Sequence, residues 1–162
     1  MSWPLTMPFS EAEKYRGQLE DSITRLNPEY SGKFAMMRHA VIYETESDRQ
    51  AALDAVRQVL ARFGNLMIQA GDVVNGYPDM VPLETLEGNA RVEPAMLEEN
   101  LMFGSPEVVV EKLKQYQSIG VDAFIYYASL GLDMERQKRS LRLFIDRVLP
   151  AFTEVKEFAH VD

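Results

Sequence analysis

Two short apolar runs, each flanked by helical patterns, constrain the fold more than any other feature of the sequence. Residues 34–43 (FAMMRHAVIY) and residues 121–128 (VDAFIYYA) are rich in aromatic and β-branched residues, which is typical of buried strands. Strands that alternate with helices are joined by right-handed crossovers and lie parallel in one sheet. The sequence therefore predicts a helix-rich α/β fold with helices on both faces of a parallel sheet.

Four helical patterns surround these runs. Apolar residues recur every three or four positions from Ser10 to Leu26, from Ser47 to Phe63, from Ser105 to Ile119 and from Asp133 to Leu149. Capping boxes are expected at Ser10 with Glu13 and at Ser47 with Gln50, further N-caps at Ser105 and Asp133, and helix ends at Gly64 and Gly120. The predicted order is therefore α-β-α, a long insert, and α-β-α.

The insert, residues 65–103, is irregular and has two interpretations. At about forty residues it is far longer than most connections, and such segments are often functional. Short helices are expected near Leu66–Ala70 and Pro94–Asn100. The insert is either a lid over a bound ligand or a surface excursion whose side chains pack locally. The side chains suited to a lid are Met67, Tyr77, Met80, Met96, Met102 and Phe103.

Two strands are too few for a complete parallel sheet. The chain has 162 residues, whereas eight βα units of a barrel need about 250. Either more strands lie in the insert or the chain is part of something larger.

Composition excludes several classes of function. Lys and Arg number 17 against 25 Asp and Glu, and the resulting charge of −8 argues against nucleic-acid binding. The absence of cysteine excludes thiol catalysis and cysteine-ligated metals, and two histidines are too few for a histidine metal cluster. The N-terminus has no signal-peptide pattern, and no apolar run is long enough to span a membrane. We therefore expect a soluble, cytoplasmic protein.

Several motifs together resemble the C-terminal part of luciferase-like flavin-dependent monooxygenases. That family ends in G-[TS]-P-E-x-V, a helix, G-V-D-x-F, and a helix that closes in V-x-P-x-F. The matching residues here are 104–109 (GSPEVV), 120–124 (GVDAF) and 148–152 (VLPAF). Residues 41–48 (VIYETESD) are similar to the family's penultimate strand and the start of its helix. The resemblance covers about residues 10–152.

The resemblance implies one partial domain over residues 1–162. Its two strands would be the last two βα units of a (β/α)8 barrel, and residues 65–103 would form a mobile lid. The family uses reduced FMN and dioxygen to oxidise a small organic substrate. Because the first six strands and most flavin contacts have no counterpart, we do not expect activity from the chain alone.

Two alternatives remain open. The chain could be a non-catalytic module, because a partial barrel exposes strand edges that invite pairing with a second copy or with a separate N-terminal chain. It could also be an incomplete reading frame.

Candidate site residues follow from the barrel rule, which places active sites at the carboxyl ends of the strands. Tyr43, Tyr126, Tyr127 and Ser129 are candidates for the wall of a flavin or substrate pocket, with Glu44 at its rim. The alternative is that the tyrosines pack in the core and Glu44 is a solvated turn residue.

Polar residues inside the first strand run provide two further candidates. Arg38 could hold an anionic ligand, and His39 is a weak candidate for a catalytic proton donor. Both could equally be structural, hydrogen-bonded within the sheet. Ser105 could bind a phosphate at its helix start, although capping explains it as well. We expect no metal site.

Overall fold

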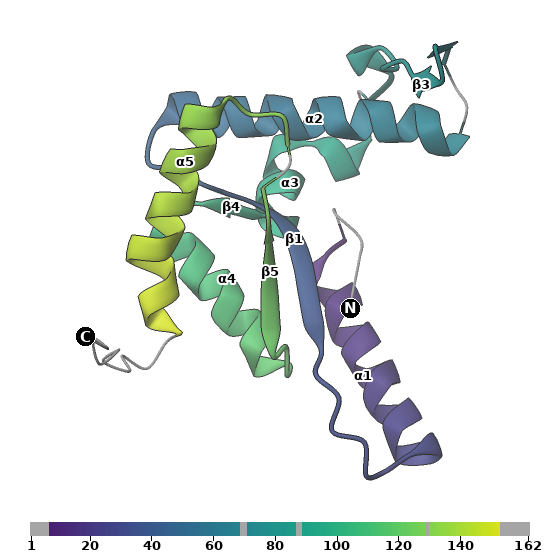
Figure 1. Cartoon of the computed structure of the whole chain (residues 1–162), viewed down its shortest axis with the longest axis vertical. Helices are drawn as coiled ribbons and strands as arrows, with labels where there is room; N and C mark the ends of the chain where they lie inside the picture. Colours follow the sequence, from purple (N-terminus) through teal and green to yellow (C-terminus); the bar gives the residue numbers. More distant parts are fainter. Residues whose placement is uncertain (1–6, 69–70, 87–88, 129, 153–162) are drawn as a thin grey trace, which may run out of the picture.

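A parallel three-stranded sheet forms the centre of the computed structural model, which describes residues 7–68, 71–86, 89–128 and 130–152. The strands β1 (Ala35–Ile42), β4 (Met102–Gly104) and β5 (Ala123–Tyr127) lie in the order β4-β1-β5 (Figure 1). β1 is parallel to both neighbours, with Arg38 opposite Tyr126 and His39 opposite Tyr127. The predicted α/β class and the parallel pairing of the two predicted strands are confirmed.

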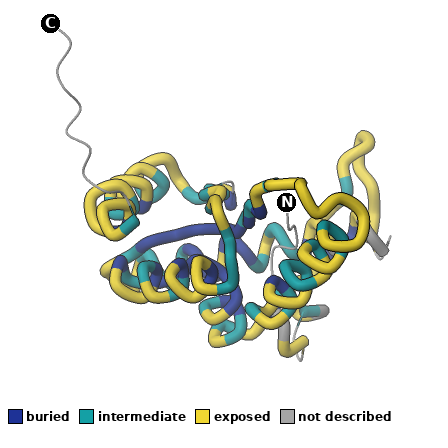
Figure 2. Tube along the Cα trace, turned by 90° about the horizontal axis from the view of Figure 1, so that it is seen from below, coloured by how far each residue is buried: buried dark blue, intermediate teal, exposed yellow. Residues whose placement is uncertain are grey.

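Helices cover both faces of β1. They are α1 (Phe9–Leu26), α2 (Glu46–Ile68), α3 (Pro94–Asn100), α4 (Pro106–Ser118) and α5 (Met134–Leu143), which continues through a π-helical turn (Phe144–Val148) and a 3-10 turn (Leu149–Ala151). Met36, Ala40 and Ile42 pack with residues of α1, α4 and the π-helical turn. Val41, on the opposite face, packs with residues of α2 and α3. Buried residues accordingly line β1, while the outer helix faces are exposed (Figure 2).

The strand order differs from the order expected of a barrel. Successive strands of a (β/α)8 barrel lie side by side, whereas here β1 lies between β4 and β5. The connection from β4 to β5 therefore crosses β1, and the sheet is open with helices on both faces. The expected partial barrel is not confirmed. β4 lay hidden in the insert because three residues are too short for a periodic pattern.

The insert divides into two parts with different environments. Leu97 and Leu101 are buried, as are Met102 and Phe103, so the end of the insert belongs to the core rather than to a lid. The hairpin of β2 (Val73–Val74) and β3 (Tyr77–Pro78) instead exposes 78% of Tyr77. It lies beside the C-terminal end of α2 (Figure 1). Two 3-10 turns, Leu83–Leu86 and Ala90–Val92, connect the hairpin to α3.

Predicted helix ends are confirmed in some places and wrong in others. Ser105 and Asp133 cap α4 and α5, Gly120 adopts the left-handed conformation with φ of 82°, and α3 matches its predicted range. α1 begins after Pro8 without a side-chain cap. The Thr45 hydroxyl, not Ser47, accepts the Asp48 N–H at the start of α2. Gly64 lies inside α2, which ends at Ile68, so the short helix expected from Leu66 is the tail of α2.

Candidate functional site

Two pockets flank the carboxyl end of β1. The loop after β1 leads to α2 on one face of the sheet, whereas the loops after β4 and β5 lead to α4 and α5 on the other face. In open α/β sheets, such a divergence of connections opens a crevice outside the strand ends, and ligands bind there. The pockets are therefore the part of the described fold best placed to hold a ligand.

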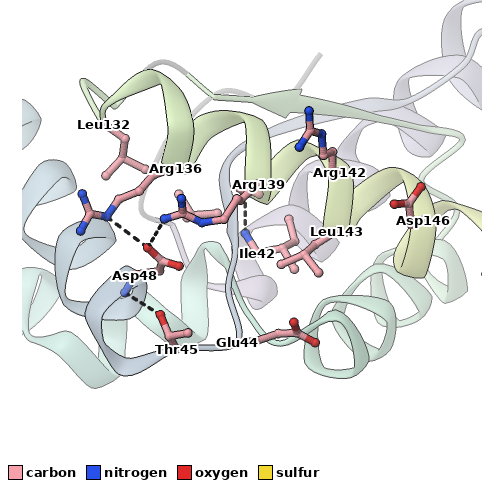
Figure 3. A pocket seen from close by; sticks show the side chains of 12 residues that line it. Ile42, Glu44, Thr45, Asp48, Leu132, Arg136, Arg139, Arg142, Leu143 and Asp146 are labelled. Carbon is pink, nitrogen blue, oxygen red and sulfur yellow. Dashed lines mark hydrogen bonds and ion pairs between the residues drawn. The ribbon is translucent and has the colours of Figure 1, made fainter.

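The first, which we call the arginine pocket, lies between the start of α2 and α5 and has a volume of about 280 Å³ (Figure 3). Its lining residues are Val41, Ile42, Glu44, Thr45, Asp48, Leu132, Arg136, Arg139, Ser140, Arg142, Leu143 and Asp146. Of these residues, only Glu44 was predicted from the sequence to lie at a ligand pocket. The arginines were missed because their spacing on α5 resembles that of an ordinary solvated helix face.

Asp48 organises the charges of this pocket. Its Oδ1 accepts hydrogen bonds from Arg136 Nε at 3.1 Å and from Arg139 Nη2 at 2.8 Å. The bond from Arg139 is the main reason that the pKa of Asp48 lies below its usual range. Arg142 lines the same pocket but points away from Asp48 (Figure 3), and it has no ion-pair partner among the described residues. Arg142 is thus the one arginine of this pocket that forms no ion pair with the described residues.

Ser140 fixes the wall between the arginine pocket and the sheet. Its buried Oγ accepts the Ile42 N–H at 2.7 Å and lies 2.7 Å from the Tyr126 hydroxyl. β5 ends at Tyr127, opposite His39, so it offers Ile42 no strand partner. Ser140 therefore continues the hydrogen-bond ladder of β1. Burial raises the pKa of Tyr126, whose protonated hydroxyl anchors α5 to the sheet.

We predict that Ser140→Ala lowers the free energy of unfolding by about 1–2 kcal/mol, because it leaves a buried N–H and a half-buried hydroxyl without a partner. Urea unfolding followed by circular dichroism measures the change. Ser118→Ala is the matched control, since the Ser118 hydroxyl is exposed and bonds only to the Gln115 carbonyl of its own helix. Equal losses for the two variants would contradict the anchoring role.

The second pocket, which we call the Tyr43 pocket, lies between the ends of β1 and β4 and has a volume of about 470 Å³. Tyr43 donates its hydroxyl hydrogen to Glu98 Oε1 at 2.7 Å, and Arg49 donates to both Glu98 oxygens at 2.5 and 2.9 Å. Arg49 is the main reason that the pKa of Glu98 is lowered, while burial raises the pKa of Tyr43. The Tyr43 hydroxyl is therefore protonated and committed to Glu98.

Lys112 closes the base of the Tyr43 pocket. Its ammonium group donates to the carbonyls of Glu98, Leu101 (2.8 Å) and Phe103 (3.0 Å). Burial lowers the pKa of Lys112 to about 8, which still leaves the ammonium form dominant at neutral pH. Lys112 and Glu98 were not predicted from the sequence. Each is a charged residue that borders the apolar stripe of its helix, a pattern shared by many ordinary surface residues.

Arg38 and His39 are both buried, with 0% and 1% of their surfaces exposed, and as neighbours in a strand they lie on opposite faces of β1. Arg38 Nη1 donates to the Met37 carbonyl at 3.0 Å, and its guanidinium lies 5.7 Å from the Tyr116 ring centre. The Arg38 Nε and Nη2 atoms have no hydrogen-bond partner within the described residues. A purely structural role predicts that the whole guanidinium is hydrogen-bonded within the sheet, but only Nη1 is bonded.

His39 stacks on Tyr127 with ring centres 4.7 Å apart. Neither ring nitrogen makes a hydrogen bond within the described part of the chain. Burial lowers the pKa of His39 to about 4, although the nearby Tyr127 backbone favours the protonated form slightly. The imidazole is therefore neutral near pH 7.

The predicted site residues do not converge on one cavity. Tyr43 lines its own pocket, Tyr126 lies behind the arginine pocket, and Tyr127 covers His39. Ser129 lies outside the described residues. The described residues contain no group of three His, Cys, Asp or Glu side chains placed to hold a metal ion. They also contain no helix that is both long and apolar enough to span a bilayer.

Comparison with known proteins finds a relative among the flavin-dependent monooxygenases. No protein-family profile matches the chain. The sequence is 25% identical over 153 residues to the oxygenase component of the flavin-dependent trigonelline monooxygenase of Acinetobacter baylyi. The alignment covers 94% of this chain, whereas the chain spans only 42% of that relative's length. The chain is therefore similar to a part of a flavin-dependent monooxygenase.

Proposed function

We propose that the chain forms part of the oxygenase component of a two-component, luciferase-like flavin monooxygenase. The observation that carries this proposal is the similarity to an oxygenase component over 94% of the chain. The motifs at residues 104–109, 120–124 and 148–152 support the luciferase-like assignment and the C-terminal position. An oxygenase component works with a reductase that supplies reduced flavin, and with a small organic substrate. In this proposal the open sheet, in the order β4-β1-β5, is one part of a longer oxygenase chain.

The cofactor we propose is FMN, and the arginine pocket fits its phosphate. Guanidinium groups bind phosphate through paired N–H donors, and the exposed Arg142 makes no ion pair within the described residues, although the Asp146 carboxylate lines the same pocket. The volume of about 280 Å³ lies at the lower limit of ligand pockets, which suits the phosphate end but not the whole cofactor. The flavin ring would therefore require surface from the remainder of the oxygenase.

The bound flavin would supply the chemistry with dioxygen, and the chain would position it. Arg142 would hold the phosphate, while Asp48 keeps Arg136 and Arg139 in place beside it. Tyr43, Tyr126, Tyr127 and Ser129 remain proposed wall residues for flavin or substrate. His39 remains a weak candidate for a catalytic proton donor, and its low pKa means that it carries no extra ring proton at neutral pH.

Titration of the chain with FMN and with riboflavin, followed by flavin fluorescence, tests the cofactor proposal. We expect FMN to bind about tenfold more tightly, because only FMN carries the phosphate. Arg142→Ala should remove most of this preference. Arg62→Ala, at an exposed site on α2, is the matched control. If neither flavin binds, the enzymatic proposal fails for this chain and a non-catalytic module is favoured.

A further inference from the structure

Arg38 is a fully buried cation in the middle of β1. None of its surface is exposed. Its side chain lies on the same face of β1 as Met36 and Ala40, which pack with residues of α1 and α4. Nη1 bonds to the Met37 carbonyl, and the other side-chain nitrogens have no partner within the described residues. No carboxylate of the described part of the chain is therefore hydrogen-bonded to this charge.

The two unpartnered nitrogens of Arg38 lie on one edge of the guanidinium. They are Nε and Nη2, whose N–H groups point in parallel from the planar group. This geometry matches the two oxygens of a carboxylate, which accept two parallel hydrogen bonds from such an edge. One carboxylate group would therefore satisfy both nitrogens and neutralise the charge.

The described neighbours of Arg38 do not neutralise it. The Tyr116 ring centre lies 5.7 Å from the guanidinium, and the ring attracts the cation only weakly. Burial raises the pKa of Tyr116, and the Arg38 charge offsets only part of that rise, so the Tyr116 hydroxyl keeps its proton at neutral pH. The other buried residues of this cluster are apolar. Because a buried charge without a counter-ion is costly, a negative group is expected beside Arg38.

The contact between α1 and α4 is short of hydrogen-bond acceptors at a second arginine as well. Arg16 of α1 lies against Gly120, just after α4, where an added Cβ would be 2.7 Å from Arg16 Nε. This Nε is also buried without a partner within the described residues. Of the residues of α1, all of which the structure describes, Ala12 alone is buried. The packing of α1 against α4 is therefore the weakest cover over this face, and an anion would enter there.

We propose that Arg38 binds one carboxylate group between α1 and α4, through its Nε and Nη2 atoms. A carboxylate fits better than phosphate, which carries more than one negative charge at neutral pH. Arg38 supplies one positive charge, and Arg16 already pairs with Glu20 at 2.9 Å. Two sources share this chemistry: a small free organic acid, and an Asp or Glu side chain of the longer oxygenase. Only the second source rests on the proposed function.

Titration of the full chain with sodium acetate, followed by heteronuclear NMR of the arginine Nε–H groups, tests the proposal. We expect the Arg38 signal, identified by its loss in Arg38→Lys, to shift until the site is saturated, with no such shift in sodium chloride. Acetate should also raise the urea midpoint of unfolding, because it binds the folded chain. Arg38→Lys keeps the charge but lacks the planar edge, so its acetate affinity should fall about tenfold or more. Arg25→Lys, at an exposed site on α1, is the matched control and should bind acetate normally.

Three results would overturn the carboxylate site: an Arg38 signal that does not move up to about 100 mM acetate, an equal rise of the urea midpoint in Arg38→Lys, or an Arg38→Met variant as unstable as one that breaks a buried ion pair. The last would show that Arg38 is already paired within the chain. Benzoate distinguishes the two sources, since it needs more room than a side-chain carboxylate. Binding of acetate alone supports a side chain, and binding of both supports a free acid. The flavin titration is a separate measurement, so its failure and the failure of this site are distinguishable.

Discussion

Lys112→Met is expected to lower the free energy of unfolding by about 3 kcal/mol. The ammonium group donates to the carbonyls of Glu98, Leu101 and Phe103. It thereby closes the end of α3 and the outer edge of β4 together. Methionine is similar in length to the aliphatic part of the Lys112 side chain, but it removes the ammonium donor from all three carbonyls. Each unsatisfied buried acceptor is costly, and charge-assisted bonds are stronger than neutral ones.

Urea unfolding of the unmodified chain and of Lys112→Met measures this loss. Lys114→Met is the matched control, because Lys114 lies on the same helix and is exposed. Lys112→Arg should restore only part of the stability, since a planar guanidinium cannot aim at three carbonyls as an ammonium can. If Lys112→Met and Lys114→Met lose the same amount, the closing role assigned to Lys112 is wrong.

Local sequence patterns predicted the helices and strands that contain a regular apolar repeat, an apolar run or a helix-capping residue. β1 and β5 were found from apolar runs, and α4 from Ser105 and Pro106 at its start, because these signals lie within a few neighbouring residues. β4 was missed because it is three residues long and owes its place to pairing with β1. The order β4-β1-β5 was likewise beyond local patterns, since it depends on long-range contacts.

The residues of the candidate site divide in the same way, into those found from local patterns and those that depend on long-range contacts. The rule that ligands bind at the carboxyl ends of strands led to Tyr43 and Glu44, and each of these residues lines one of the two pockets at the end of β1. The partners of these residues could not be predicted. Tyr43 meets Glu98, and Asp48 meets Arg139, across separations of 55 and 91 residues. Such pairs are set by how helices pack on the sheet, which a single sequence does not display.

Lowering the pH from 6.5 to 4 is expected to cost the fold about 3 kcal/mol through His39 alone. Burial lowers the pKa of His39 from 6.5 in the unfolded chain to about 4 in the folded chain. Between these values the unfolded chain binds a proton that the folded chain does not. His39 therefore supports stability above pH 6.5, and this support is lost as the pH falls through 4.

His39→Phe isolates this effect, because phenylalanine keeps an aromatic ring against Tyr127 and cannot bind a proton. The unfolding free energy of each protein is measured by urea titration at intervals from pH 4 to 8. Carboxylates titrate in both proteins, so the difference between the two curves reports His39. We expect His39→Phe to gain about 3 kcal/mol relative to the unmodified chain between pH 6.5 and 4. Parallel curves would show that the imidazole finds a partner on protonation, and would contradict the view that burial alone keeps it neutral.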